Sequence, residues 1–404
     1  MNSRAIGWDI HRKFSQVSVR EVLPDGELCI VERKRLDHAD REAMSAWLAG
    51  QPAGTPVALE AAFGWPWVAD LLEAFGLDPH LAHPPAVRVL AKHQAKTDRC
   101  DADRLAEFQL FGILPESYLA PPQVRQLRER TRYRMALAKL RTGLKNRLQA
   151  QLHREGILHA FSDLFGKAGR EFLAGLVLPE ATREVLDGHL ALLDQVQSRI
   201  DQVEQWMTQH LAEDEITQLL TSLPGIGKIL AHVIQAEVGQ MERFPSRRHF
   251  ASYCGLAPVS DDSAARHGQR HLSQACNRTL RWAFIEAANV AAGVGAKRAP
   301  RLASLSERLK RHGRTKGQAK AAVARELCEL AYIVWSKRQP YTLTPPPRPG
   351  SPSRTQRRNS KITDARDGRP VACAQPKPES CLPSDQPRHP MVRRKRRAAG
   401  QTPS

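Results

Sequence analysis

Short runs of apolar or alternating residues predict five strands in the first part of the chain. They cover Arg4–Asp9, Phe14–Val22, Leu28–Glu32, Val57–Glu60 and His80–Ala82. Helices are expected over about Ala39–Leu48, with Asp37 as the N-cap, and over about Pro66–Ala74. Three antiparallel strands followed by alternating helices and strands is the order of an RNase H-like fold, so we expect an α/β domain here.

After Pro122 the spacing of apolar residues changes to that of long amphipathic helices. The two apolar stripes are Tyr133, Leu137, Leu140, Leu144, Leu148 and Leu152, and Leu190, Leu193, Val196, Ile200, Val203 and Met207. The segment around residues 156–179 would join them as an antiparallel pair. The stripes predict either a packed helical core or a coiled coil between copies of the chain.

The remaining sequence predicts a mainly helical region and a basic tail. The helical region opens with the turn-forming stretch Leu223–Lys228 and continues to about Arg338. From Pro340 to Ser404 the chain contains 14 Lys or Arg against 4 acids, which predicts a disordered, phosphate-attracting tail. We therefore divide the chain into residues 1–121, 122–213, 214–338 and 339–404.

The charge of the chain narrows the choice of partner. Its 404 residues carry a net charge of +19, and nucleic acid is favoured over a membrane surface because no basic amphipathic anchor stands out. No apolar run approaches the ~20 residues that span a bilayer, and residues 1–9 lack a signal-peptide layout, so a cytoplasmic protein is expected. The seven cysteines are scattered, which argues against a disulfide framework or a zinc ribbon.

Four acidic residues stand where an RNase H-like topology can bring them together. Asp9 ends the first strand, Glu60 ends the fourth, and Asp98 and Asp101 lie one turn apart at the start of a helix. Carboxylate oxygens suit Mg²⁺, and two such ions can clamp the attacking and leaving oxygens of a phosphoryl displacement. Asp103 is the nearest rival to Asp101 but falls on a different helical face. Each acid alone is more often a cap or turn residue; together they predict a catalytic metal site.

A polar, basic segment of the third region contains a candidate nucleophile. Ser263 lies in a loop between Pro258 and a basic run. A serine hydroxyl attacks phosphorus only when a base or metal assists it and cations stabilise the transition state. Arg266, Arg270, Arg278 and Arg281 could supply those cations, and Arg266, Arg270 and Arg281 are the expected phosphate contacts. Without that context, a loop serine beside an acid is most often a capping residue.

The stretch Leu223–Lys228 resembles the hairpin of a helix-hairpin-helix element. Its glycines let backbone N–H groups approach phosphate at a helix N-terminus, where Lys228 adds a positive charge. A simple turn between two helices has the same sequence pattern, so both interpretations stay open.

Together these features resemble the DEDD transposases of the IS110 family and its IS1111 subgroup. The similarity extends over about residues 4–335 and rests on these ordered motifs: Gly7-Trp8-Asp9, Leu59-Glu60, Lys96-Thr97-Asp98 with Asp101-Ala102, Leu223-Pro224-Gly225-Ile226-Gly227, Phe250 through Pro258, and Asn277 to Arg281. The resemblance implies an N-terminal RuvC-like domain, a helical coiled-coil insertion and a C-terminal transposase domain. It also implies a homo-oligomer, a dimer or tetramer, in which the metal centre of one protomer meets a serine from another.

The resemblance assigns roles to individual residues. The family's four acids, which hold Mg²⁺, match Asp9, Glu60, Asp98 and Asp101. The family's serine, which attacks DNA and forms a transient link to the 5′ phosphate, matches Ser263. Because Ala264 stands where the family usually has glycine, Ser260 and Ser273 remain alternatives.

The expected function is therefore that of a transposase, a recombinase that cuts and rejoins DNA. The family resemblance also implies an element-encoded, structured non-coding RNA that guides the choice of DNA. One alternative is a metal-dependent nuclease or Holliday-junction resolvase that uses water as the nucleophile. Another is a nucleic-acid-binding protein that retains the fold without catalysis.

Overall fold

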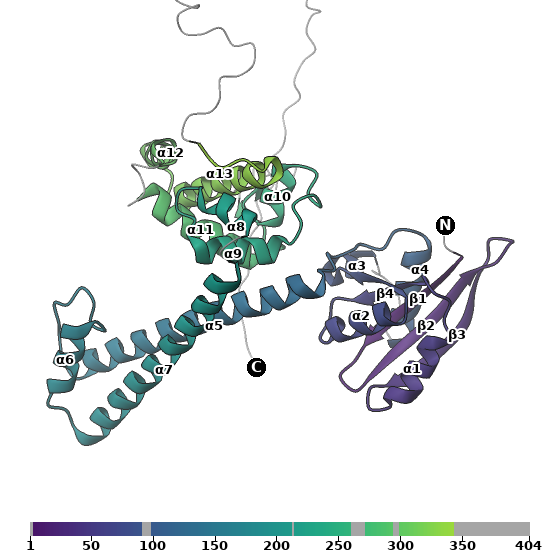
Figure 1. Cartoon of the computed structure of the whole chain (residues 1–404), viewed down its shortest axis with the longest axis horizontal. Coiled ribbons are helices and arrows are strands. Elements are labelled where there is room, and N and C mark those ends of the chain that lie inside the picture. The colour runs from purple at the N-terminus through teal and green to yellow at the C-terminus, as the bar shows by residue number, and fades with distance from the viewer. Residues whose placement is uncertain (1–2, 91–97, 212–213, 260–270, 294–298, 343–404) are drawn as a thin grey trace, which may run out of the picture. The chain divides into compact units, whose positions relative to one another are not determined.

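The computed structural model describes residues 3–90, 98–211, 214–259, 271–293 and 299–342, with the backbone alone at residues 98, 99 and 211 (Figure 1). Residues 343–404, which make up most of the predicted basic tail, lie outside these ranges. Within them, every helix is too short or too polar to cross a membrane.

The N-terminal region contains a five-stranded mixed sheet. Its strands are β1 (Arg4–Ile10), β2 (Phe14–Val22), β3 (Leu28–Asp37), β4 (Pro56–Glu60) and β5 (Asp78–Ala82). They lie in the order β3-β2-β1-β4-β5. The pairs β1–β2 and β2–β3 are antiparallel, whereas β1–β4 and β4–β5 are parallel. The predicted α/β class is confirmed, and the mixed sheet is consistent with an RNase H-like domain.

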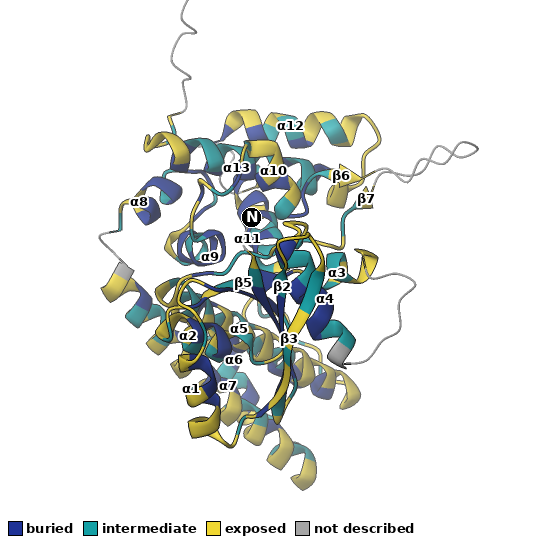
Figure 2. Cartoon of the chain, turned by 90° about the vertical axis from the view of Figure 1, so that its right-hand side faces the viewer, coloured by how far each residue is buried: buried dark blue, intermediate teal, exposed yellow. Residues whose placement is uncertain are grey.

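Alternation along β1 sends its side chains into two layers. The helices of this region are α1 (Arg41–Ala49), α2 (Trp65–Ala74), α3 (Pro84–Leu90) and α4 (Asp98–Leu110). Ile6 and Trp8 are buried in a core that includes Trp47 of α1 and Leu72 of α2. Gly7 faces the opposite layer, where α4 packs on the sheet. Figure 2 shows α1 and α4 on opposite sides of the strands, with the buried residues in dark blue.

The absence of a side chain at Gly7 lets α4 approach β1 closely. A Cβ atom at Gly7 would lie 1.8 Å from the carbonyl oxygen of Ala102 and 2.7 Å from the backbone nitrogen of Ala106. Both neighbours are backbone atoms of α4, so a flexible side chain cannot move aside to relieve the overlap. Gly7 therefore sets the distance between α4 and the strand that carries Asp9.

We expect Gly7→Ala to lower the free energy of unfolding by about 2–3 kcal/mol, because the added methyl group overpacks the contact between α4 and β1. Urea denaturation followed by tryptophan fluorescence measures the change. Gly143→Ala is the matched control, since a Cβ there meets nothing within 4 Å and alanine favours the helix. Equal stability of the Gly7→Ala variant and the wild type would contradict this account.

Two local expectations for this region were wrong in detail. The N-cap of α1 is Asp40, not Asp37, since the Asp40 side chain accepts the N–H of Ala43 at 2.9 Å. Asp37 instead ends β3 and accepts the N–H of Ala39 at 2.9 Å. Strand β3 runs beyond Glu32 because β2 offers a partner along its whole length.

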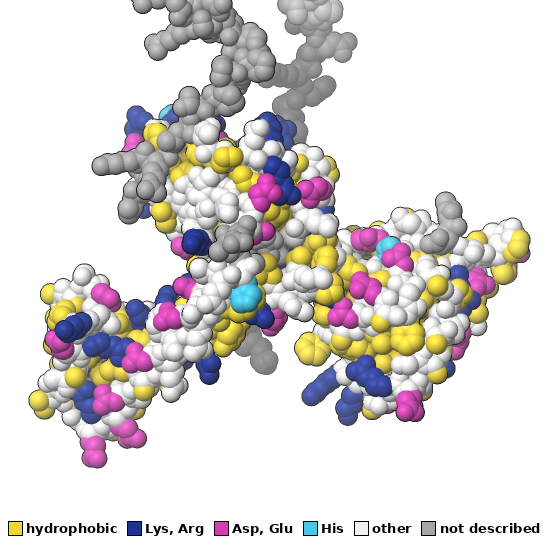
Figure 3. Space-filling view, in the orientation of Figure 1, with side chains coloured by type: hydrophobic (Ala, Val, Ile, Leu, Met, Phe, Trp, Pro, Cys, Tyr) yellow, Lys and Arg dark blue, Asp and Glu magenta, His cyan; other side chains and the backbone are white. Residues whose placement is uncertain are grey.

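The predicted helical pair consists of α5 (Pro122–Arg154) and α7 (Glu180–Leu211), with α6 (Lys167–Gly175) near their far end (Figure 1). Leu144, Leu148 and Leu152 are buried between the helices, as the stripe predicted. Tyr133 and Leu140 were expected in the same stripe but are about half exposed, so the buried face is narrower than the sequence suggested. Figure 3 shows basic and acidic side chains interspersed on this pair.

The C-terminal region is a bundle of helices with one short ribbon. Its elements are α8 (Glu215–Thr221), α9 (Lys228–Val238), α10 (Arg247–Tyr253), β6 (Pro258–Val259), β7 (His271–Leu272), α11 (Arg278–Ala292), α12 (Pro300–Arg311) and α13 (Lys316–Lys337). The turn between α8 and α9 contains Gly225 with φ +86°, and a Cβ there would lie 2.2 Å from the carbonyl oxygen of Ala287. Packing against α11 thus accounts for this glycine without a phosphate.

Candidate active site

Asp9 lies one residue before the end of β1, which runs on to Ile10, and Glu60 ends β4, the parallel neighbour of β1. In the β1–β4 register Trp8 lies opposite Leu59, so the next position on each strand holds one of the two acids. Asp9 is nearly buried, and its Oδ2 lies 3.0 Å from Nε2 of His11. Glu60 is half-buried, and its carboxylate has no hydrogen-bond partner among the described residues.

Two polar contacts fix the direction in which α4 crosses the sheet. Ser18 Oγ donates to Asp103 Oδ1 at 2.6 Å. Two residues further along β2, Arg20 Nη1 donates to Glu107 Oε1 at 2.5 Å. Helix α4 therefore runs parallel to β2 and antiparallel to β1, so that its first turn lies toward the end of β1 that carries Asp9.

The same register gives the level of the first turn of α4. Asp103 bonds to the β2 residue that lies opposite Gly7, so it marks the level of Gly7. One turn of helix back from Asp103 covers about 5.4 Å, which is close to the roughly 6.6 Å of two residues along a strand. The turn that contains Asp98 and Asp101 is thus at the level of Asp9.

The backbone register does not by itself assemble a coordination shell. Asp101 is about one-third exposed and accepts a hydrogen bond from Arg104 Nη1 at 2.9 Å. The side chain of Asp98 lies outside the described residues. Among the described residues, no group of three or more His, Cys, Asp or Glu is placed to hold a metal ion. Carboxylate oxygens at this end of the sheet still suit a hard divalent cation, and the metal site stays a prediction.

Asp103 has a different role from the acids at the strand ends. It is almost buried, and its carboxylate accepts Arg33 Nε at 3.0 Å and Arg33 Nη2 at 2.5 Å in addition to the Ser18 hydroxyl. Burial alone would raise the pKa of Asp103, but the hydrogen bonds from Arg33 and Ser18 and the charge of Arg20 hold it below its ordinary value. Asp103 is therefore an ion-pair residue that fastens α4 to the sheet.

Residues 260–270 lie outside the described residues. They include the candidate nucleophile Ser263, the alternative Ser260, and the two expected phosphate contacts Arg266 and Arg270. What the structure describes is the base of that segment. Strands β6 and β7 pair there, with Pro258 opposite Leu272 and Val259 opposite His271. Ser273, the other alternative, is half-buried, and its Oγ donates to the carbonyl of Ala275 at 3.3 Å.

The remaining predicted phosphate contacts differ in their surroundings. Lys228 is exposed at the N-terminus of α9, after the N-cap Gly227. Arg281 is half-buried, and its Nη2 donates to the carbonyl of Ser273 and to Sγ of Cys276 at 2.7 Å. Arg281 thus holds the loop that follows β7, and its use as a phosphate ligand remains a prediction.

Two family models match this chain in the regions that hold these residues. A model described as a transposase of the DEDD IS110 type matches residues 6–156, and a model described as the transposase IS116/IS110/IS902 family matches residues 217–304. The chain belongs to the IS110/IS116/IS902 family of transposases. The family predicted from the motifs is confirmed, whereas the IS1111 subgroup stays a prediction.

Three curated proteins that are similar to this chain align with between 30% and 69% of it. An uncharacterized 44.8 kDa protein of insertion element IS116 from Streptomyces clavuligerus is 32% identical over 40% of this chain and 41% of its own length. A transposase for insertion sequence element IS1328 from Yersinia enterocolitica is 25% identical over 69% of this chain and 83% of its own length. A pilin gene-inverting protein from Moraxella bovis is 35% identical over 30% of this chain and 38% of its own length.

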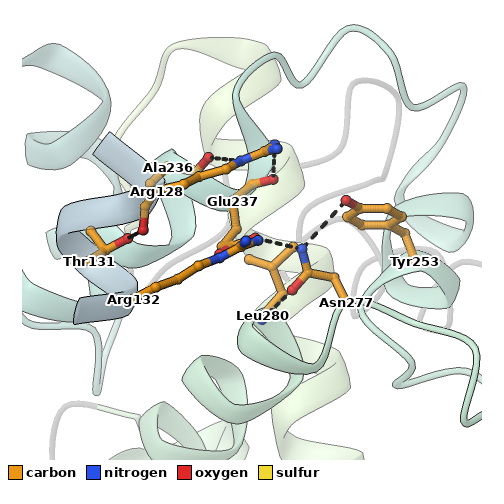
Figure 4. Close-up of polar contacts among 8 residues, drawn as sticks. All are labelled: Arg128, Thr131, Arg132, Ala236, Glu237, Tyr253, Asn277 and Leu280. Atoms are coloured by element: carbon orange, nitrogen blue, oxygen red, sulfur yellow. Dashed lines mark hydrogen bonds and ion pairs between the residues drawn. The ribbon is translucent and has the colours of Figure 1, made fainter. Parts of the chain in front are cut away.

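A buried ion-pair cluster joins the two regions matched by the IS110-family models. Glu237 of α9 is fully buried, and its carboxylate accepts Arg132 Nε and Nη2 of α5 at 2.7 and 2.9 Å. Asn277 Nδ2 donates to the same carboxylate at 2.8 Å. Arg128 of α5 donates to the carbonyls of Ala236 and Glu237 at 2.7 and 2.9 Å (Figure 4). The cluster therefore fixes α5 against the C-terminal bundle.

The surroundings of Glu237 keep it ionised despite its burial. Burial alone would raise the pKa of Glu237, but hydrogen bonds from Arg132 and Asn277 and the charges of Arg132 and Arg128 hold it below its ordinary value. Glu237 was not among the residues predicted from the sequence. The available signal was a single acid in the mostly apolar helix Lys228–Val238, since a buried acid requires a partner.

Proposed function

We propose that this chain is a DNA strand-transfer recombinase of the IS110 family, which cuts and rejoins DNA through a covalent serine intermediate. The observation that carries the proposal is the register of β1, β4 and α4, which aligns Asp9, Glu60 and the turn of Asp98 and Asp101 at one end of the sheet. DNA is the substrate, and an element-encoded RNA guides the choice of site. The chain acts as a dimer or tetramer.

In this proposal Ser263 and the four acids divide the work. The Ser263 Oγ attacks phosphorus, a bond forms between them, and the bond from phosphorus to the 3′ oxygen of the neighbouring nucleotide breaks. A carboxylate of the acidic set accepts the hydroxyl proton, and the departing 3′ oxygen takes up a proton from solvent. Lys228, Arg266, Arg270 and Arg281 bind the phosphates on either side.

The acids Asp9, Glu60, Asp98 and Asp101 would hold Mg²⁺, which when bound supplies positive charge next to the reacting phosphate. Strand rejoining reverses the first step: a free 3′ hydroxyl attacks the phosphoserine, and Ser263 leaves with its proton restored. No net hydrolysis occurs, so the energy of the phosphodiester is conserved in the ester. Among the relatives, the Moraxella bovis protein named for pilin gene inversion supports recombination over simple cleavage.

The decisive experiment traps the covalent intermediate. The full chain is incubated with Mg²⁺, RNA transcribed from the flanking non-coding sequence, and radiolabelled DNA carrying the ends of its element and a nick beside the cleavage position. The wild type is expected to form a protein–DNA adduct that survives denaturing electrophoresis. Ser263→Ala should form none, whereas Ser260→Ala and Ser273→Ala should form it at the wild-type level.

Other outcomes point to other functions. Cleavage without any adduct would identify the alternative, a metal-dependent nuclease or junction resolvase with water as the nucleophile. An adduct that persists in Ser263→Ala and disappears in Ser260→Ala or Ser273→Ala would move the nucleophile and retain the recombinase.

A further inference from the structure

A pocket of about 410 Å³ lies between the β6–β7 ribbon and the start of α13. We name it the α13 pocket; Leu272 and Leu309 line it from the ribbon and from α12, and Ala321 and Ala322 line it from α13. All four side chains are half-buried. The two alanines leave the hollow open, because any longer side chain on that face of α13 would fill it. Figure 2 shows the ribbon beside α12 and α13.

The rim of the α13 pocket is polar and positively charged. Arg314 and Gln318 line it together with the apolar residues, and Arg314 forms no ion pair with any described residue. Residues 299–320, which form α12, the following turn and the first turns of α13, contain seven Lys or Arg and one Glu. The surroundings of the pocket therefore favour a ligand with several negative charges.

We propose that the α13 pocket binds one unstacked base of a single-stranded nucleic acid, while Arg314 and the cations of the α12–α13 turn bind the phosphates beside it. The volume falls within the range of about 300–1,000 Å³ of small-ligand pockets and has the usual apolar walls with few polar groups. Single-strand binding commonly combines an apolar surface for base faces with a basic track for the backbone. The residues of the pocket and its rim supply both parts.

The position of the α13 pocket suits a role in binding the DNA or RNA of the proposed reaction. The assignment of the pocket to a nucleic acid rests on that proposed function. One wall is the ribbon whose two strands precede and follow residues 260–270 in the sequence, a segment that includes Ser263. A base held there belongs to a nucleotide close in sequence to the attacked phosphodiester, or to the RNA that pairs beside it. The pocket thus selects an unpaired nucleotide rather than a duplex.

The test compares oligomers that carry the same phosphates with and without bases. Fluorescence anisotropy in EDTA measures binding of the full chain to a thymidylate oligomer about twelve nucleotides long and to its abasic counterpart. The wild type is expected to bind the base-bearing oligomer about tenfold more tightly. Ala321→Leu, or Ala322→Leu as a second variant, should remove this preference and leave the abasic affinity unchanged. Arg314→Ala should weaken the binding of both oligomers equally. It should also lower the slope of the logarithm of the binding constant against the logarithm of the salt concentration by about 1.

Matched controls separate the pocket from the general charge of the chain. Ala150→Leu and Arg154→Ala alter exposed positions of α5 and should leave both affinities unchanged. The proposal is overturned if the wild type binds both oligomers equally, or if both leucine variants fold and retain the preference. The same measurements are made with a uridylate oligomer and its abasic counterpart. The nucleic acid, RNA or DNA, for which the base-bearing oligomer is preferred more strongly is identified as the source of the bound base. Because EDTA prevents cleavage, the result is independent of whether the adduct experiment succeeds.

Discussion

Asp9→Asn is expected to lower the rate of DNA strand cleavage roughly a thousandfold while leaving the fold intact. The amide keeps the size of the side chain but removes the negative charge that helps to hold a divalent ion, and bound metal supplies several kcal/mol of transition-state stabilisation. Single-turnover cleavage of nicked DNA measures the rate. Asp9→Cys should be inactive with Mg²⁺ and partly active with Mn²⁺, because a thiolate prefers the softer ion.

Asp103→Asn provides the matched control on the same sheet. Its carboxylate is engaged by Arg33 and Ser18, so its loss should reduce the free energy of unfolding by about 2 kcal/mol. Cleavage measured well below the melting temperature should remain within about threefold of the wild type. If the two variants exchange these phenotypes, Asp103 is the metal ligand and the assignment of the acidic set is wrong.

Glu237→Gln is expected to lower the free energy of unfolding by about 3 kcal/mol. It leaves the guanidinium of Arg132 without a countercharge at the buried joint between α5 and α9. The value lies at the low end of the range for broken buried pairs because about half of the Arg132 side chain is exposed and its charge is screened by solvent.

The same residue predicts how stability depends on pH. The pKa of Glu237 is lower in the folded chain than its ordinary value. The stability that its ionised carboxylate contributes is therefore fully present above about pH 4.3 and is lost as the pH falls through the folded pKa. The stability difference between the wild type and Glu237→Gln should therefore be largest near pH 7 and shrink in acid. Urea midpoints across this range test it, with exposed Glu242→Gln as a control that stays within about 0.5 kcal/mol of the wild type.

The strands of the N-terminal sheet were predictable because their side-chain pattern is local. Alternation over Phe14–Val22 located β2 to the residue, and the apolar run before Glu60 located the end of β4. The placement of Asp9 beside Glu60 also follows once the two strands are known to be parallel neighbours. Periodicity and turn residues thus supplied both the sheet and the position of two candidate ligands.

Features that depend on distant partners were missed. Arg132 and Glu237 are 105 positions apart, and no local pattern encodes which arginine reaches a buried acid. The role of Gly7 could not be predicted either, since only the packing of α4 against β1 shows that a side chain at this position would overlap the helix backbone. The predicted burial of Tyr133 and Leu140 was wrong although their helical spacing was right. Helix α7 covers a narrower face of α5 than the apolar stripe predicted, so these two side chains stay half exposed.

Helix α5 makes its contacts at fixed angles around one axis. Arg125 donates to the carbonyl of Pro66 at 3.3 Å and pairs with Asp70 of α2, and Arg132, two turns later, reaches Glu237. Each residue of a helix turns it by about 100°, so one residue inserted between these arginines would swing one of them away from its partner. Length changes tolerated in evolution should therefore fall outside the part of α5 between these arginines, as in the connection at residues 155–179.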